Sequence, residues 1–164
     1  MLCLQQLQVH TSAPTKEDRA LLPNCDGRPA DVLISNYIGG LHAALDVSVI
    51  NPMQAQTISK AAEEPGHALH VRHTQKLKKY GDKCLAEGIK FCPVVCETMG
   101  AWHPEAASLL KRLGCSLARA TGGEEGEVVR HFFSRLSVLL MRSNASLLLH
   151  RVPTTTRPEV DGYI

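Results

Sequence analysis

Aromatic side chains are scarce in this chain, which has one Trp, three Tyr and three Phe among 164 residues. Proteins that hold single-stranded nucleic acid stack the bases on aromatic rings, so the scarcity argues against a base-stacking binder. Long apolar runs are missing as well. The stretch 138–141 is bounded by Arg135 and Arg142 and is far shorter than the roughly 18 apolar residues that cross a bilayer. We therefore expect no membrane span.

The sequence also lacks a strong net charge and an obvious metal-binding or disulfide pattern. Its 18 basic and 16 acidic residues sum to +2, which is too weak a field to indicate nucleic acid by itself. The first ten residues lack the basic and apolar regions of a signal peptide, so we expect the six cysteines to be reduced thiols in the cytosol or nucleus. His67, His70 and His73 lie three apart, but no fourth ligand has suitable spacing and no C-x-x-C pair occurs, so we expect no zinc site there.

What is present is an ordinary globular composition, with 44% hydrophobic and 21% charged residues. A chain of this length forms one domain with a buried core and needs no disulfide or metal ion to stabilise it. We expect the domain to cover residues 1–151. The last segment, 152–164, contains Pro153, Pro158 and three threonines and is expected to be a loose tail.

A strand hairpin is the clearest structural signal. Apolar runs at 31–34 and 41–49 are separated by Gly39-Gly40, which suits a hairpin turn. A third, nearly continuous apolar run of strand length, 89–96, suggests an interior strand, although Pro93 favours a sheet edge or a bulge.

Helical patterns fill the intervals between and after these strands. Asn51 and Pro52 resemble an N-cap and first helical residue, which predicts a helix over 51–64. Further helices are predicted over 67–87, where Gly81 is expected to break or kink the helix, and over 104–120 and 124–151. The order predicts an α/β fold in which helices flank one small sheet.

Two aspartates are the strongest candidates for chemistry. Asp31 begins one predicted strand and Asp46 lies within the next, with fourteen residues between them. Asp46 stands among Ala44, Leu45 and Val47, so its carboxylate is expected to be buried, and an unpaired buried carboxylate is costly. Two carboxylates that share a site favour a hard divalent ion such as Mg²⁺. The simpler interpretation is a strand cap and a hydrogen-bonded sheet aspartate.

Lysines follow on the predicted helix 67–87, in the run Lys76-Leu-Lys78-Lys79-Tyr80. Helical spacing groups Lys76 with Lys79 and Tyr80 rather than with Lys78, and which of the lysines faces the aspartates is left open. A lysine beside a metal site can stabilise charge on a phosphate, although a solvated helix face is the ordinary role of such a run.

These residues resemble the restriction-like endonuclease domain of site-specific non-LTR retrotransposons, a branch of the PD-(D/E)xK nuclease superfamily. The resemblance rests on R-P-A-D-V-L-I, D-V-S-V and K-L-K-K-Y, and on the segments KFCPVVCETMGAW and RLSVLLMRSNASLLLHR. It covers residues 14–151 and implies a small mixed central sheet flanked by helices, restriction-endonuclease-like, with two C-terminal helices. The first helix of that fold would have to come from residues 1–12, so we expect it to be shortened here.

The resemblance also implies roles for individual residues. Asp31 and Asp46 would bind Mg²⁺ or Mn²⁺, Glu17 is the candidate for an additional upstream acidic ligand, and Lys76 would be the catalytic lysine. Ser48 occupies the position of the superfamily's usual lysine, two residues after the second acid, so the role passes to the helix. The candidates for supporting roles are Tyr80, Lys79 and Arg28.

The implied activity is hydrolysis of a DNA phosphodiester bond by a metal-activated water. The expected partners are DNA and the reverse transcriptase of a parent element. One alternative is a catalytically inactive DNA- or protein-binding remnant of the same fold. Another is an α/β protein with no nucleic-acid role, whose carboxylates are structural.

Overall fold

The computed structural model describes residues 15–16, 30–38 and 41–151. Several sequence expectations fall outside these ranges and are not addressed by the structure. They are the short first helix, Glu17, Arg28, the Gly39-Gly40 turn and the tail 152–164.

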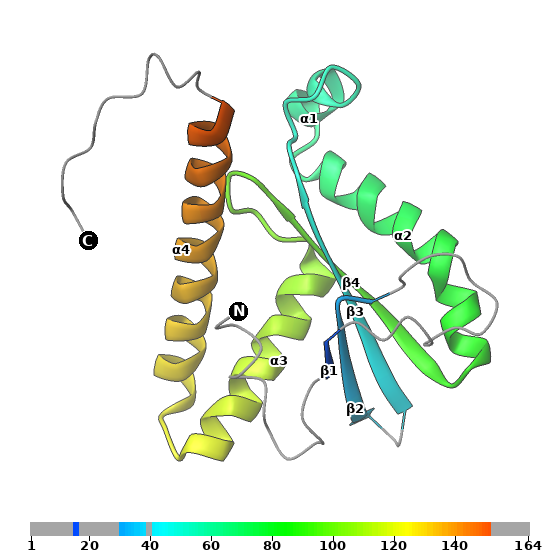
Figure 1. The fold of residues 1–164 in the computed structure, drawn as a ribbon, viewed down its shortest axis with the longest axis vertical. Coiled ribbons are helices and arrows are strands. Elements are labelled where there is room, and N and C mark those ends of the chain that lie inside the picture. The colour runs from blue at the N-terminus through cyan, green and yellow to red at the C-terminus, as the bar shows by residue number, and fades with distance from the viewer. Residues whose placement is uncertain (1–14, 17–29, 39–40, 152–164) are drawn as a thin grey trace.

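The described part of the chain contains a mixed sheet of three long strands and one very short one (Figure 1). The strands are β1 (Thr15–Lys16), β2 (Val32–Ile38), β3 (Leu41–Ile50) and β4 (Ile89–Glu97), in that spatial order. β2 and β3 form the antiparallel hairpin predicted from the Gly39-Gly40 turn, with Val32 opposite Leu45. β4 runs parallel to β3, with Pro93 opposite Asp46. The predicted strand containing Pro93 is thus an edge strand of the described sheet.

Four helices complete the described structure. They are α1 (Ile58–Glu63), α2 (His67–Ala86), α3 (Pro104–Thr121) and α4 (Glu125–Arg151). The last three lie within a residue of the sequence predictions at each end. α3 begins with His103 as N-cap followed by proline, and it ends at Gly122 with a positive φ of 68°, the usual chemistry of a helix start and stop.

The helices cover both faces of the sheet, and α2 lies on the opposite face from α3 and α4 (Figure 1). On one face, Ala44 packs with Tyr80 and Cys84 of α2. On the other face, strand residues meet α3 and α4 in the larger core cluster, which comprises Val32, Ile34, Ala43, Leu45, Val94, Ala106, Leu109, Leu110 and Phe132. Neighbouring residues of β3 therefore point into different layers, as strand geometry requires. Asp46 has the same parity as Ala44 and lies on the α2 side.

Two predictions about the helices α1 and α2 are wrong. The helix expected over 51–64 begins only at Ile58, and the chain from 52 to 57 runs in turns, although the Asn51 side-chain oxygen accepts from the Met53 N–H (3.0 Å) the hydrogen bond that a helix cap would also make. Gly81 does not break α2, whose buried residues Tyr80 and Cys84 flank it; the packing of this face outweighs the roughly 1 kcal/mol that glycine costs in a helix.

Nothing in the described part of the chain is a membrane-spanning helix, because no helix there is both long enough and apolar enough.

Candidate functional site

Asp46 is a buried carboxylate paired with one lysine. It lies in the middle of β3, is 5% exposed, and faces α2. The ammonium of Lys76 lies 2.7 Å from Asp46 Oδ2 and donates a hydrogen bond to Oδ1 at 3.0 Å. The two residues are thirty positions apart, and the packing of α2 across β3 and β4 brings them together. The ion pair supplies the compensation that a buried charge requires.

Asp31 lies beside the backbone of the residue that follows Asp46. It is exposed and precedes β2, and its Oδ2 accepts a hydrogen bond of 2.7 Å from the Val47 N–H. Its own N–H donates to the Leu45 carbonyl at 2.8 Å. The start of β2 thus places the Asp31 carboxylate against the Asp46–Val47 peptide.

Lys76 and Lys79 share a face of α2 with Tyr80, as the helical spacing predicts. Their amines lie 6.0 Å and 4.8 Å from the centre of the Tyr80 ring, within the range of cation–π attraction. Lys78 is exposed. Of the three lysines, the structure brings Lys76 to the buried carboxylate.

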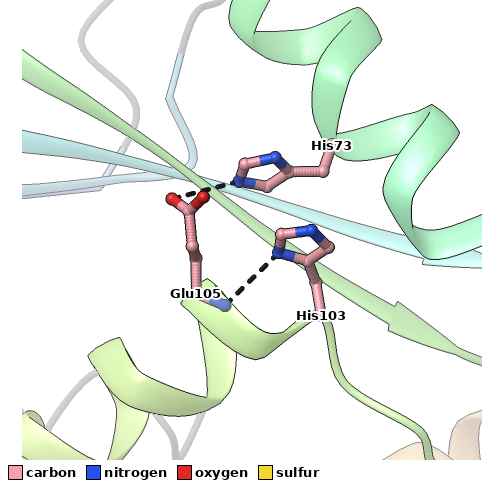
Figure 2. A group of neighbouring side chains, drawn as sticks. All are labelled: His73, His103 and Glu105. Carbon is pink, nitrogen blue, oxygen red and sulfur yellow. Dashed lines mark hydrogen bonds and ion pairs between the residues drawn. The ribbon is translucent and has the colours of Figure 1, made fainter. Parts of the chain in front are cut away.

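A second polar group lies one turn of α2 away. Figure 2 shows His73 from α2 stacked on His103, with Glu105 in the first turn of α3 beside both rings. The ring centroids are 3.8 Å apart and the rings are nearly parallel, at 10°. Glu105 Oε2 lies 3.5 Å from His73 Nε2, and His103 Nδ1 accepts a hydrogen bond of 3.4 Å from the Glu105 N–H.

Burial favours the neutral form of both imidazoles in this group. His73 and His103 are 3% and 6% exposed. Desolvation lowers the pKa of His73 below its ordinary value, although the Glu105 carboxylate acts in the opposite direction. Desolvation, and then the neighbouring His73, lower the pKa of His103. Neutral imidazole is the form that binds metals.

The sequence did not predict His103 or Glu105 as site residues, because its spacing pattern groups His73 only with His67 and His70. In the structure, His67 bonds Glu64 at 2.9 Å, whereas the His70 ring lies beside His103, with the ring centroids 6.1 Å apart. The available signal was His103-Pro104-Glu105 at a helix start directly after the third strand. Trp102, at the same junction, packs against the larger core cluster.

Comparison of the chain with known protein families, with curated proteins and with solved structures finds no match.

Proposed function

We propose that this domain is a metal-dependent DNA endonuclease with a restriction-endonuclease-like fold, in which Asp46, Asp31 and Lys76 form the hydrolytic site. The observation that carries the proposal is the pairing of Lys76 with a buried strand aspartate. The mixed sheet with helices on both faces and two C-terminal helices is compatible with that fold. The motifs that resemble the retrotransposon nuclease domain supply the choice of substrate.

The donor set fits a hard cation. Asp46 Oδ2 has the Lys76 ion pair but no hydrogen bond among the described residues, so the buried oxygen retains capacity for a further ligand. The exposed Asp31 carboxylate can turn toward the same region from its bond to Val47. Carboxylate oxygens are the ligands of Mg²⁺ and Mn²⁺. A bound ion would neutralise phosphate charge and lower the pKa of a coordinated water.

Lys76 has the donors to act on both the carboxylate and a substrate. Its ammonium carries three N–H groups, and the hydrogen bond to Asp46 Oδ1 uses one of them. The side chain is 17% exposed, so a remaining donor can reach a phosphate oxygen at the surface. In this arrangement Lys76 orients Asp46 and stabilises the charge that develops on the phosphate during attack.

The test is a nicking assay on supercoiled plasmid with Mg²⁺ or Mn²⁺. We expect the native chain to nick, and Asp46→Asn and Lys76→Met to lose about 100-fold or more of the rate. The matched controls are Asp82→Asn and Lys78→Met, which change exposed residues of the same helix and should nick like the native chain. Circular dichroism establishes that each variant is folded.

Equal nicking by the native chain and Asp46→Asn would end the enzymatic proposal. Absence of nicking together with salt-sensitive retention of DNA would select the inactive binding remnant instead, because phosphate contacts weaken as salt rises. Absence of both would leave a structural role for the carboxylates.

A further inference from the structure

The three side chains shown in Figure 2 form a candidate metal site that is independent of the proposed nuclease site. Among the described residues, His73, His103 and Glu105 offer ligand atoms that all lie within 4.8 Å of one another. Two of the three side chains are buried, and they come from α2 and from the start of α3, which are separated by β4 in the chain. Tertiary packing, not local sequence, therefore assembles the group.

His73 has an unsatisfied atom aimed into this group. Its Nε2 is buried and has no hydrogen-bond partner among the described residues. The contact to Glu105 at 3.5 Å is longer than a good hydrogen bond. A buried polar atom without a partner costs free energy, and a metal ion at this point would satisfy it.

We propose that His73, His103 and Glu105 bind one zinc ion. Two imidazole nitrogens and one carboxylate oxygen suit Zn²⁺ and do not suit Mg²⁺, which prefers oxygen ligands. Three protein ligands leave one tetrahedral position open, an arrangement typical of catalytic and ligand-binding zinc sites rather than of structural ones.

To close the site, the two imidazole rings must tilt out of their nearly parallel stack, because the in-plane lone pairs of parallel rings do not meet at one ion. Tetrahedral bonds of about 2.1 Å place neighbouring ligand atoms about 3.4 Å apart, closer than the 4.8 Å limit within which they lie. Glu105 is 74% exposed in its side chain and can move. The 3.4 Å bond that His103 Nδ1 accepts is long and is weakened at little cost.

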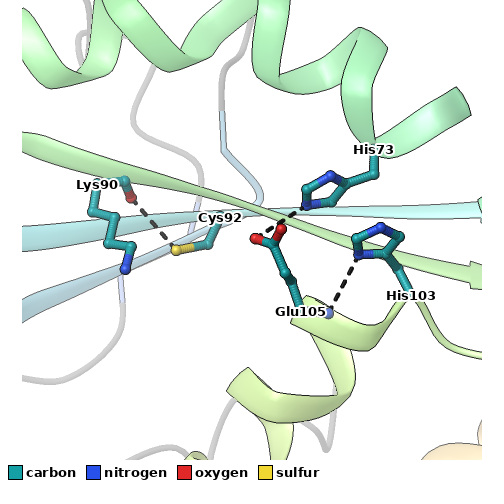
Figure 3. A network of polar contacts seen from close by, with 5 residues as sticks. All are labelled: His73, Lys90, Cys92, His103 and Glu105. Carbon is teal, nitrogen blue, oxygen red and sulfur yellow. Dashed lines mark hydrogen bonds and ion pairs between the residues drawn. The ribbon is translucent and has the colours of Figure 1, made fainter. Parts of the chain in front are cut away.

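The open position would face a cavity of about 340 Å³ at the edge strand β4. His73 and Glu105 line it together with Lys90, Cys92 and Arg112. Figure 3 shows Cys92 on β4 near the group, with its thiol directed to the Lys90 carbonyl at 3.8 Å. Cys92 is therefore left out of the ligand set, and the two basic side chains favour a water or a small anion as the fourth ligand.

Zinc titration of the full chain after removal of bound metal tests the proposal. We expect one equivalent to bind, with Glu105→Gln weakening the affinity at least about tenfold and His73→Gln or His103→Asn abolishing binding. Asparagine caps helices well, so His103→Asn keeps the start of α3. The controls His131→Gln and Glu127→Gln change exposed residues of α4 and should bind zinc like the native chain.

Cobalt substitution identifies the ligands by spectroscopy. Four-coordinate Co²⁺ bound by nitrogen and oxygen shows visible d–d bands without a thiolate charge-transfer band, which is the expected result. The proposal is overturned by a charge-transfer band, by the absence of stoichiometric zinc binding, or by a folded Glu105→Gln variant that binds as tightly as the native chain. Because the plasmid assay uses Mg²⁺ or Mn²⁺ and other residues, its failure would leave this test unaffected.

Discussion

Replacing Lys76 by methionine should leave the Asp46 carboxylate buried and unpaired. The Asp46 and Lys76 side chains are 7% and 17% exposed, and their contacts are 2.7 and 3.0 Å long. Removing one partner of a buried pair costs about 3–5 kcal/mol. The partial exposure of Lys76 admits water, so we expect a loss near 3 kcal/mol in the free energy of unfolding.

A double-mutant cycle isolates the pair from the packing of the two side chains. Asp46→Asn removes the charge but keeps the shape, and the stranded ammonium can still reach solvent, so this change should cost about 1–2 kcal/mol. The Asp46→Asn/Lys76→Met chain should lose less than the sum of the single changes, with a coupling of about 1–3 kcal/mol. Urea unfolding followed by circular dichroism measures all four chains, with Lys78→Met, expected within about 0.5 kcal/mol of native, as the control. Additive losses would refute the buried pair as a stabilising unit.

Two further predictions concern the packing of helices and a buried thiol. A Cβ at Gly114 would lie 3.0 Å from Val129 Cγ2 and 3.4 Å from its Cα, so Gly114→Ala should destabilise the α3–α4 contact by about 1–2 kcal/mol in urea unfolding. A Cβ at Gly81 would contact only Leu77, at 3.9 Å, so Gly81→Ala should stabilise the folded chain by up to about 1 kcal/mol. A change of stability in the same direction for both substitutions would contradict these predictions. Burial raises the pKa of the Cys96 thiol from 9.0 to about 11. The unfolded chain therefore loses this proton first, and about 2 kcal/mol of the free energy of unfolding should be lost as pH rises from 9 towards 11. Cys96→Ala should reduce this decline, and identical curves of stability against pH for the variant and the native chain would disprove the prediction.

Much of the fold could be predicted because its signals are local. The β2–β3 hairpin follows from two apolar runs joined by Gly39-Gly40, and α2, α3 and α4 follow from periodic apolar positions and from residues such as Gly122 that end helices. Asn51 shows the limit of such reasoning. An asparagine oxygen can cap a helix or close a turn on the second residue after it, and α1, which has no buried residue, gains no packing energy that would extend it back to Pro52.

The two candidate sites differ in how far the sequence could indicate them. The burial of Asp46 was predictable from its apolar neighbours, and Lys76 lies on the helix face predicted to carry Tyr80. His73 and His103, by contrast, meet only because α2 and the start of α3 come together beside β4. No periodicity within either segment indicates a contact between residues so far apart in the sequence, so the pair could not be predicted without the structure.

The proline in the outer strand also bears on how copies of this protein behave toward one another. Pro93 interrupts β4 near its middle, and its ring nitrogen carries no hydrogen to donate. A strand from a second molecule that approached this border would meet a gap in the row of donors where a continuous ladder is needed. The fold thereby discourages intermolecular β-pairing along its outermost long strand, a safeguard against aggregation.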